Sequence, residues 1–410
     1  MKSSYNHHLK FEISGQSHSE EISLLIYNIQ PGFEIDFDKI DEQLNLRQGN
    51  QSFNTYRQEK ISYEIRSGFD KTVNSKKFKT DGQTIEIIFI NSDIKSQDYD
   101  NILKQPRPGH VDYVASMKYG REHSIAGGGH FSARLTLPLV FVGSLIQQIV
   151  LSYYPTLNIV SHVKSFGNYN DLCYYELRKY LVDKIIKEDL NSLHDLDSFN
   201  ERKLANFASK LTTNLHKIVV NGLSNEPLPT YHKKIGQQML AKAKALSDDS
   251  LGGQIETIII NPPSFIGEPW FYSLESALAS LMYSIPSIKE IAFGNSELFK
   301  NAYGSEVKDE IIYLDNRKLT TLYNHNGGIN GGITNGEDIV FSTVIKPISS
   351  INQIQNTYHL QERKMTFLQI AGRHDKTVIN RVIPIINALS YVAIYDLILA
   401  NKIHDKIKYV

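Results

Sequence analysis

The sequence predicts a layered α+β fold, and two kinds of hydrophobic periodicity predict it. In short segments bounded by Gly, Asn, Asp or Pro, apolar and polar residues alternate, as they do in half-buried strands. Longer segments carry apolar residues three and four positions apart, which is the spacing of one buried helix face. Because both patterns recur along the chain, we expect helices packed against sheets.

The expected elements follow in chain order. Alternating segments predict strands at 8–14, 61–67, 84–90 and 255–260. Helical spacing predicts helices at 139–154, 274–285 and 382–400. Polar stretches predict loops at 45–58 and 323–337, the second of them rich in glycine. No internal repeat is evident.

Between Asn168 and Asp249 the composition changes to Lys, Asp, Asn, Leu and Tyr. Stretches such as YYELRKYLVDKIIKEDL are typical of an amphipathic helix with a solvated face. The chain of 410 residues exceeds the usual size of one hydrophobic core. We nevertheless expect a single domain spanning 1–410, with a polar helical insertion at about 168–247.

Composition excludes several classes of protein. Lys+Arg and Asp+Glu both number 44, so no basic surface predicts binding to nucleic acid or to an anionic membrane. The single cysteine, Cys173, excludes an intramolecular disulfide and suits a reducing compartment. The N-terminus lacks the apolar stretch of a signal peptide, and polar residues interrupt 382–400, so we expect a buried helix there and a cytoplasmic protein.

The segment RPGHVDYVASMKYGREHSIAGGGHFSAR, residues 107–134, suggests a ligand-binding loop. Its three consecutive glycines, Gly127 to Gly129, allow backbone N–H groups to approach a ligand closely. A helix beginning near Ser132 would point its positive end at an anion, such as the phosphate of a flavin. A tight turn between a strand and a helix explains the glycines as well.

Two further features point the same way. A second glycine cluster at 324–336 precedes Lys346, which again combines a permissive backbone with a cation. His18 and His110 lie beside Gly and Ser in loop-like contexts, where a histidine is available for proton transfer near neutral pH. The histidines lack the spacing of a zinc site, so we expect no metal.

Taken in order, these motifs resemble the chorismate synthase family. GQSHS (15–19), SQDY (96–99), RPGHVDY (107–113) and GGGHFSAR (127–134) are similar to that family's consecutive landmarks. DDSLGG (248–253), GEP (267–269), NHNGGINGGIT (324–334), KPISSI (346–351) and GRHD (372–375) continue the resemblance. It does not cover the polar segment at about 168–247.

The resemblance implies a β-α-β sandwich fold, a homotetramer, and a flavin-dependent lyase that binds reduced FMN and an anionic small molecule. The implied reaction is the anti-1,4-elimination of phosphate from 5-enolpyruvylshikimate 3-phosphate to give chorismate, with an external flavin reductase as a possible partner. The implied catalytic residues are His18, His110 and Asp375. The implied substrate-binding residues are Arg47, Arg107, His130, Arg134 and Arg373. The implied cofactor-binding residues are Ser132, Asn324, Gly327, Gly328, Gly331, Gly332, Lys346, Ser350 and Arg373.

Departures from the family pattern concern mainly the anion site. The chain has Ala126 and His130 where the family places arginines around the triple glycine, and it retains only Arg47 of an earlier arginine run. Loss of guanidinium groups predicts weaker or altered binding of the phosphorylated substrate. Three hypotheses follow: a lyase acting on this substrate or a related cyclohexene acid, a catalytically silent flavin-binding or oligomeric homologue, and a structural protein that retains the fold.

Overall fold

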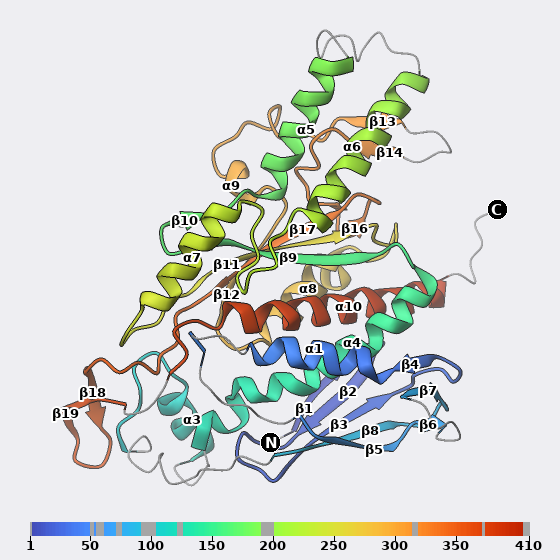
Figure 1. Cartoon of the computed structure of the whole chain (residues 1–410). Coiled ribbons are helices and arrows are strands. Elements are labelled where there is room, and N and C mark those ends of the chain that lie inside the picture. The colour runs from blue at the N-terminus through green and yellow to red at the C-terminus, as the bar shows by residue number, and fades with distance from the viewer. Residues whose placement is uncertain are drawn as a thin grey trace.

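The structure, a computed structural model, describes residues 2–49, 53–54, 61–70, 76–91, 104–120, 126–189, 201–313, 319–370 and 374–404. Two five-stranded antiparallel sheets enclose a layer of helices, and more helices cover the far face of one sheet (Figure 1). The predicted α+β class is confirmed.

The first sheet has its strands in the order β1 (Lys2–Asn6), β2 (Lys10–Ser14), β3 (Glu21–Tyr27), β8 (Ile85–Ile90), β5 (Tyr63–Ser67). Only its inner face packs on helices, so β2 and β3 alternate between buried and more exposed residues. This alternation explains why the strands expected at 8–14 and 61–67 were recognisable in the sequence, whereas the strand expected at 84–90 buries Ile87 to Phe89 in succession.

The second sheet has its strands in the order β10 (Tyr169–Asn170), β9 (Asn158–Phe166), β11 (Gly253–Ile260), β17 (Ile339–Ile345), β12 (Ile288–Phe293). Helices cover both of its faces. Residues 255–260 of β11 are therefore all buried, including the polar Glu256 and Thr257, in a strand that we expected to alternate between buried and exposed residues.

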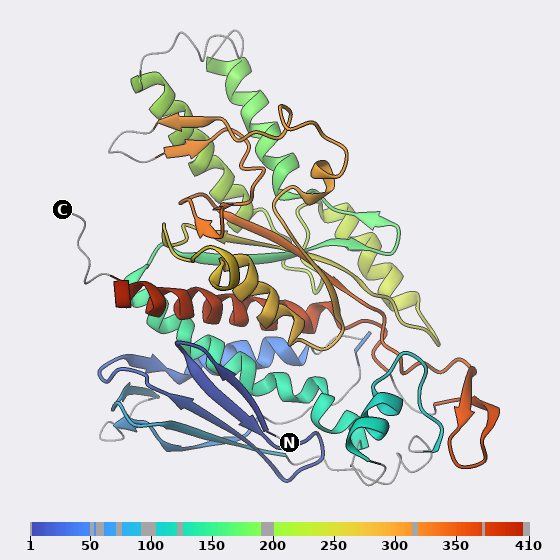
Figure 2. The same ribbon diagram turned by 180° about the vertical axis from the view of Figure 1, so that it is seen from behind.

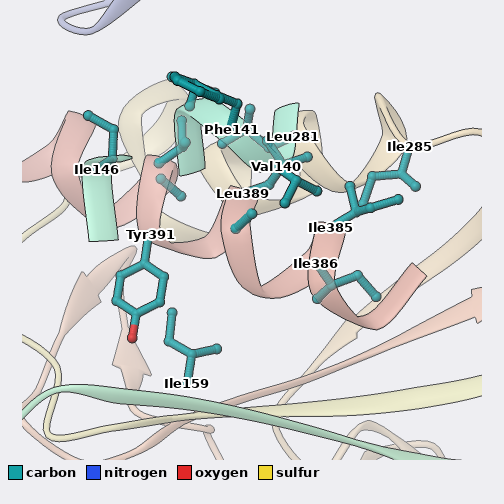
Figure 3. Packing of buried hydrophobic residues seen from close by; sticks show 14 of the residues in the cluster. Val140, Phe141, Ile146, Ile159, Leu281, Ile285, Ile385, Ile386, Leu389 and Tyr391 are labelled. Atoms are coloured by element: carbon teal, nitrogen blue, oxygen red, sulfur yellow. The ribbon is translucent and has the colours of Figure 1, made fainter. Parts of the chain in front are cut away.

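The layer between the sheets contains α1 (Phe37–Gln48), α4 (Thr136–Tyr153), α8 (Leu274–Tyr283) and α10 (Ile379–His404). Helices α4 and α10 approach closely because Gly143 has no side chain where it faces Ala388. Figure 3 shows Val140 and Phe141 of α4 in the same apolar cluster as Leu389 of α10, while Tyr391 points toward Ile159 of β9.

Three helices lie over the outer face of the second sheet: α5 (Tyr174–Asp189), α6 (Glu201–Asn221) and α7 (Lys233–Ala245). Figure 2 shows the molecule from behind, with these helices beyond the sheet. Helices α5 and α6 form a second apolar cluster with that sheet, in which Leu181 of α5 and Leu215 of α6 join Ile258 of β11. Met239 and Ala243 of α7 belong instead to the cluster that contains Val140 and Leu389. The segment that we expected to be a polar insertion thus buries an apolar face of its own.

Smaller elements complete the fold: α3 (Asp112–Tyr119), α9 (Ser296–Phe299), the hairpins β13–β14 (Ile311–Tyr313, Leu319–Thr321), β15–β16 (Ile329–Asn330, Ile333–Thr334) and β18–β19 (Gln355–His359, Lys364–Leu368), and the sheet of β4 (Glu34–Asp36), β7 (Lys77–Thr80) and β6 (Phe69–Asp70).

Two sequence-based expectations differ from the structure in their boundaries. The helix expected to begin near Ser132 begins at Thr136, after 3-10 turns at Ala126–Phe131 and Ala133–Leu135. Pro138 lies in its first turn, where a missing N–H breaks no helical hydrogen bond. The loop expected from 45 is helical to Gln48, because Gly49, with φ of 77°, ends α1 only there.

Among the described residues, two helical segments, Ala133–Tyr153 and Ile379–Asn401, are long and apolar enough to span a membrane, but 72% and 83% of their most apolar windows are buried inside the fold. The buried helix expected at 382–400 is confirmed. Its Asp396 accepts a hydrogen bond from the backbone N–H of Leu9 at 2.6 Å, which ties the first hairpin to α10.

Candidate active site

The loop that carries His18 is fixed against the triple-glycine segment. The backbone N–H of Ser17 donates to the carbonyl of Gly129 at 2.9 Å. The Ser17 carbonyl accepts from Nη1 of Arg134 at 2.5 Å and from Nδ2 of Asn91 at 2.9 Å. Segments more than 100 residues apart in sequence therefore meet, and they hold His18 at a half-buried position.

His130 is bound at both ring nitrogens. Its Nδ1 lies 3.0 Å from the carbonyl oxygen of Gly15, and its Nε2 lies 2.7 Å from Oγ of Ser3. Because a carbonyl only accepts, Nδ1 must carry a hydrogen, and a neutral ring then accepts from the Ser3 hydroxyl. His130, predicted to bind substrate, holds the His18 loop in this structure.

Two predicted substrate-binding arginines line one hollow at the end of the helical layer. Arg47, in the last turn of α1, and the buried Arg134 share this hollow with Asn91. Its volume of about 30 Å³ is about the share of one water molecule in the liquid.

A larger cavity, of about 770 Å³, opens beside His110 and Arg107. Pro106 to His110 form one of its walls, and Tyr113 of α3 continues that wall. This volume falls within the range of small-molecule sites in proteins, about 300–1,000 Å³.

The orientation of His110 is set by a buried carboxylate. Oδ1 of Asp112 lies 2.6 Å from Nδ1 of His110, and Arg107 donates to Asp112 from Nε at 2.7 Å and from Nη2 at 2.8 Å. Burial by itself would raise the pKa of Asp112, but the hydrogen bonds from Arg107 and His110 lower it well below its usual range. An ionised Asp112 accepts only, so Nδ1 of His110 carries a hydrogen and Nε2 is left for a ligand.

Asp112 was missed as a functional residue in the sequence, although it stands two residues after His110 in RPGHVDY. Arg107, predicted to bind substrate, is buried here and engaged by Asp112 and by Oγ of Ser350 at 3.0 Å. In this geometry Arg107 positions the carboxylate that positions His110.

Lys346 and Ser349 fasten this loop from the end of β17. Nζ of Lys346 donates to the carbonyl of Gly109 at 2.5 Å, and the Ser349 hydroxyl donates to the same carbonyl at 2.8 Å. Burial and the nearby Lys289 lower the pKa of Lys346. The predicted cofactor ligands Lys346 and Ser350 therefore lie beside His110.

Asp375 lies just before α10 and forms an ion pair with Arg381, whose Nη1 is 2.9 Å from the carboxylate. Nε of Arg381 also donates to the carbonyl of Gln48 at the end of α1. Asp375 is thereby placed at the same end of the helical layer as Arg47. Arg373 and residues 96–99 lie outside the described residues.

The glycine-rich loop lies away from these residues. Gly327 pairs with Val340 at the start of β17, whereas Lys346 follows its end, and the six residue steps from Val340 to Lys346 span about 20 Å. Thr334 pairs with Phe265, whose carbonyl accepts from Asn401 near the far end of the 26-residue α10. Within one chain, the glycine-rich loop and Lys346 therefore lie at opposite ends of β17.

Side chains from within and behind this loop hold its shape. Asn324, which is fully buried, donates to the carbonyl of Asp338 and accepts from the N–H of Gly328, both at 2.8 Å. Gly327 and Gly328 have φ of 63° and 78°, which a glycine adopts without strain. Arg178 of α5 donates to Glu337 at 3.0 Å, and His216 of α6 contacts Asp338 at 2.8 Å. Helices of segment 168–247 thus brace the loop.

Known proteins resemble this chain over nearly its whole length. The family model described as "Chorismate synthase" matches residues 9–399. Relatives named chorismate synthase include those of Pyrococcus abyssi, 28% identical over 97% of this chain and 98% of theirs, and Prochlorococcus marinus, 31% identical over 98% of both chains. A solved structure described as "Crystal Structure of Chorismate Synthase" superposes with a TM-score of 0.64 at 22% identity, over 96% of this chain and 92% of that one.

Proposed function

The chain belongs to the chorismate synthase family, and from this membership we propose that it converts 5-enolpyruvylshikimate 3-phosphate to chorismate and phosphate. The single observation that carries the proposal is the fixed orientation of His110 by Asp112 at the edge of a cavity of about 770 Å³. This is the arrangement that a proton-transferring group in a ligand site requires.

The residues around His110 fit reduced FMN as the cofactor. Lys346, Ser349 and Ser350 gather at this loop and supply the cation and the hydroxyl groups that an anionic flavin needs. When bound, reduced FMN supplies electron density that helps to expel the allylic phosphate and recovers it as the ring hydrogen departs. The reaction is then redox-neutral: a C–O bond and a C–H bond break, and one C=C bond forms.

The chain's own residues manage the protons. We assign to His18 the donation of a proton to the departing phosphate, since its loop is fixed by Ser17 and Arg134. His110 keeps one hydrogen toward Asp112 and exchanges its other proton at Nε2. Asp375, oriented by Arg381, assists removal of the ring hydrogen. Arg47, Arg134 and Arg373, together with His130, are the groups proposed to bind the anionic substrate.

A homotetramer offers a role for the glycine-rich loop. Because the glycine-rich loop lies at the start of β17 and Lys346 follows its end, we propose that they contact one flavin from different copies of the chain. We propose that Gly327, Gly328, Gly331 and Gly332 of one copy, shaped by Asn324, approach the flavin held by Lys346 and Ser350 of another, with Ser132 as a further cofactor contact. Turnover by a mixture of two inactive variants, one altered in each region, would support this arrangement.

We further propose one domain spanning 1–410, in which the segment 168–247 serves the same site because α5 and α6 brace the loop. The enzyme is proposed to act in the cytoplasm as a carbon–oxygen lyase on phosphates. Its reduced flavin is proposed to come from an external reductase.

An anaerobic assay with dithionite-reduced FMN and 5-enolpyruvylshikimate 3-phosphate tests the proposal. We expect chorismate and phosphate to appear in equal amounts. Binding of FMN without release of either product would contradict it and favour the silent homologue. Turnover only with a related cyclohexene acid would keep the chemistry and change the substrate.

A further inference from the structure

The cavity beside His110 has a second wall, which no family landmark described above includes. Asn356, Thr357, Tyr358, Arg363 and Met365 of the β18–β19 hairpin line it opposite the Pro106 to His110 loop. The hairpin is anchored to the chain just before that loop, because Oγ1 of Thr357 donates to the carbonyl of Pro106 at 2.5 Å. The N–H of Leu360 also donates to the carbonyl of Lys104 at 2.9 Å. These hydrogen bonds therefore fix the position of the hairpin wall relative to the loop wall.

The charged side chains that line this cavity favour an anionic ligand. Among the described residues that line the cavity, the only acidic or basic side chains are Arg107, His110 and Arg363, and none is a carboxylate. The charge of Arg107 is neutralised by Asp112. Arg363 is therefore the lining cation whose charge is not neutralised by a residue of the described chain.

The neighbours of Arg363 leave its guanidinium available. Glu362, the adjacent acid, binds Nζ of Lys364 at 2.6 Å and lies 3.6 Å from Nε2 of His359. No ion pair or side-chain hydrogen bond joins Arg363 to any other described residue. A guanidinium offers five N–H donors in a planar fork that matches a phosphate or a carboxylate.

The backbone at Arg363 gives a second, independent indication. Its φ is 54°, in the left-handed region where glycine is the usual residue at the end of a hairpin turn. A side chain at such a position disfavours the turn, and residues held in this way occur preferentially at ligand sites. The turn itself therefore gives no reason for an arginine here.

We propose that Arg363 is a substrate-binding residue, which pairs with the phosphate or carboxylate of the anionic small molecule in the cavity beside His110. The proposal rests on the proposed function and extends it, because it assigns the anion to the hairpin wall. Tyr113 and Tyr358 on the same lining supply flat apolar surface for a ring. Arg363 would offset part of the charge missing at Ala126 and His130.

The test compares Arg363→Gly and Arg363→Lys with Lys118→Gln in the full chain under anaerobic conditions. Arg363→Gly removes the guanidinium while it favours the turn, so failure to fold is not expected. Lys118 is an exposed cation of α3 that lies over the ring of Tyr119 and does not line the cavity. We expect Arg363→Gly to raise KM for 5-enolpyruvylshikimate 3-phosphate about tenfold or more and to change kcat less than about threefold. Arg363→Lys should give an intermediate KM.

The outcomes separate this inference from the proposed function. An unchanged KM in Arg363→Gly, or an equal rise in Lys118→Gln, would overturn the inference while wild-type turnover stands. A weaker Kd for reduced FMN with an unchanged KM would assign Arg363 to the flavin phosphate and would also overturn it. If the wild type shows no turnover, the proposed function fails. Calorimetric titration of wild type and Arg363→Gly with the same substrate in the presence of oxidised FMN then decides the inference, because loss of binding in the variant supports it and equal binding contradicts it.

Discussion

Oδ1 of the buried Asp112 lies 2.6 Å from Nδ1 of the half-buried His110, and Nη2 of Arg107 contacts both groups, at 2.8 Å from Oδ1 and 2.9 Å from Nδ1. A histidine flanked by an arginine alone would present a lone pair to it. The Asp112 carboxylate reverses this, because it accepts from both Arg107 and His110 and so fixes a hydrogen on Nδ1. The chemical behaviour of His110 therefore depends on a residue two positions away.

Asp112→Asn should lower kcat by about 10- to 100-fold, less than the loss from removing a general acid or base outright. The amide has no charge and can turn either its oxygen or its nitrogen toward His110, so the ring is no longer held in one form. Steady-state kinetics with reduced FMN measure the effect. Asp249→Asn, at an exposed position, is the control and should match the wild type. A kcat for Asp112→Asn within twofold of the wild type would contradict the positioning role.

The same substitution should change stability in a pH-dependent way. The pKa of Asp112 is lowered in the folded chain, so the stability that its charge contributes is present above the ordinary value of about 4 and is lost as pH falls. At pH 7, Asp112→Asn leaves buried Arg107 without its partner, and we expect a loss of about 3 kcal/mol in the free energy of unfolding. Urea unfolding should show that the difference in free energy of unfolding between wild type and Asp112→Asn becomes smaller below pH 4. A gap that stays constant to pH 2.5 would exclude this origin.

For His162, the pH dependence of its contribution to stability has the opposite sign. It is fully buried between Asp171 and Glu256, and although burial alone would lower its pKa, hydrogen bonds to these carboxylates raise it. Its contribution to stability is therefore present below the ordinary value of about 6.5 and is lost as pH rises through the folded pKa. The double variant His162→Gln/Glu256→Gln removes the charge pair, and Asp171 keeps its backbone donors from Tyr231 and His232. Thermal unfolding should show the wild-type advantage shrinking from pH 6 toward pH 9.5. An advantage that does not change over this range would contradict a charged His162.

Gly143→Ala tests the contact between α4 and α10. A Cβ at Gly143 would meet the backbone of Ala388, with its Cα at 2.6 Å, so the helices would have to separate. We expect a loss of about 3 kcal/mol in the free energy of unfolding. Gly304→Ala is the matched control, because a Cβ there meets no atom within 4 Å, and it should be neutral. Equal stabilities of the two variants would show that the helices have room to adjust.

The sequence predicted the individual helices and strands better than it predicted which segments contact one another. Strands such as 8–14 were recognisable because one face of the first sheet stays partly exposed, and this leaves a period of two in the burial of β2. The pairing of Ser17 with Gly129 joins positions 112 residues apart, and no local pattern contains it. The resemblance grouped these loops, but their hydrogen bonds needed coordinates.

The candidate site shows more clearly that sequence patterns do not predict contacts between distant segments. Lys346 follows the glycine-rich loop closely in sequence, yet β17 carries it to the opposite end of a sheet. Arg107 was predicted to bind substrate, but its partner Asp112 decides whether it is available to a ligand. Spacing predicts residue types at a site, whereas the partner of each side chain depends on tertiary structure.

The brace behind the glycine-rich loop gives a last prediction. Arg178 is buried at 3% exposure and joins both ends of the loop: its Nη2 and Nε donate to the carbonyls of Thr321 and Leu322, and Nη1 donates to Glu337. Arg178→Met would leave the charge of Glu337 buried without a cation, so we expect a loss of about 3–5 kcal/mol in the free energy of unfolding.

Two control variants distinguish a loss of the hydrogen bonds that hold the glycine-rich loop from a general loss of stability. Lys179→Met removes an exposed charge from the same helix and should cost less than about 0.5 kcal/mol. Arg178→Met/Glu337→Gln should recover part of the loss, because the uncompensated charge is gone. Hydrogen exchange should be faster at the amides of Gly328 and Gly332 in Arg178→Met, and their rates should not change in Lys179→Met. If the glycine amides stay as protected as in the wild type while the whole protein loses stability, Arg178 supports the second apolar cluster and does not hold the loop.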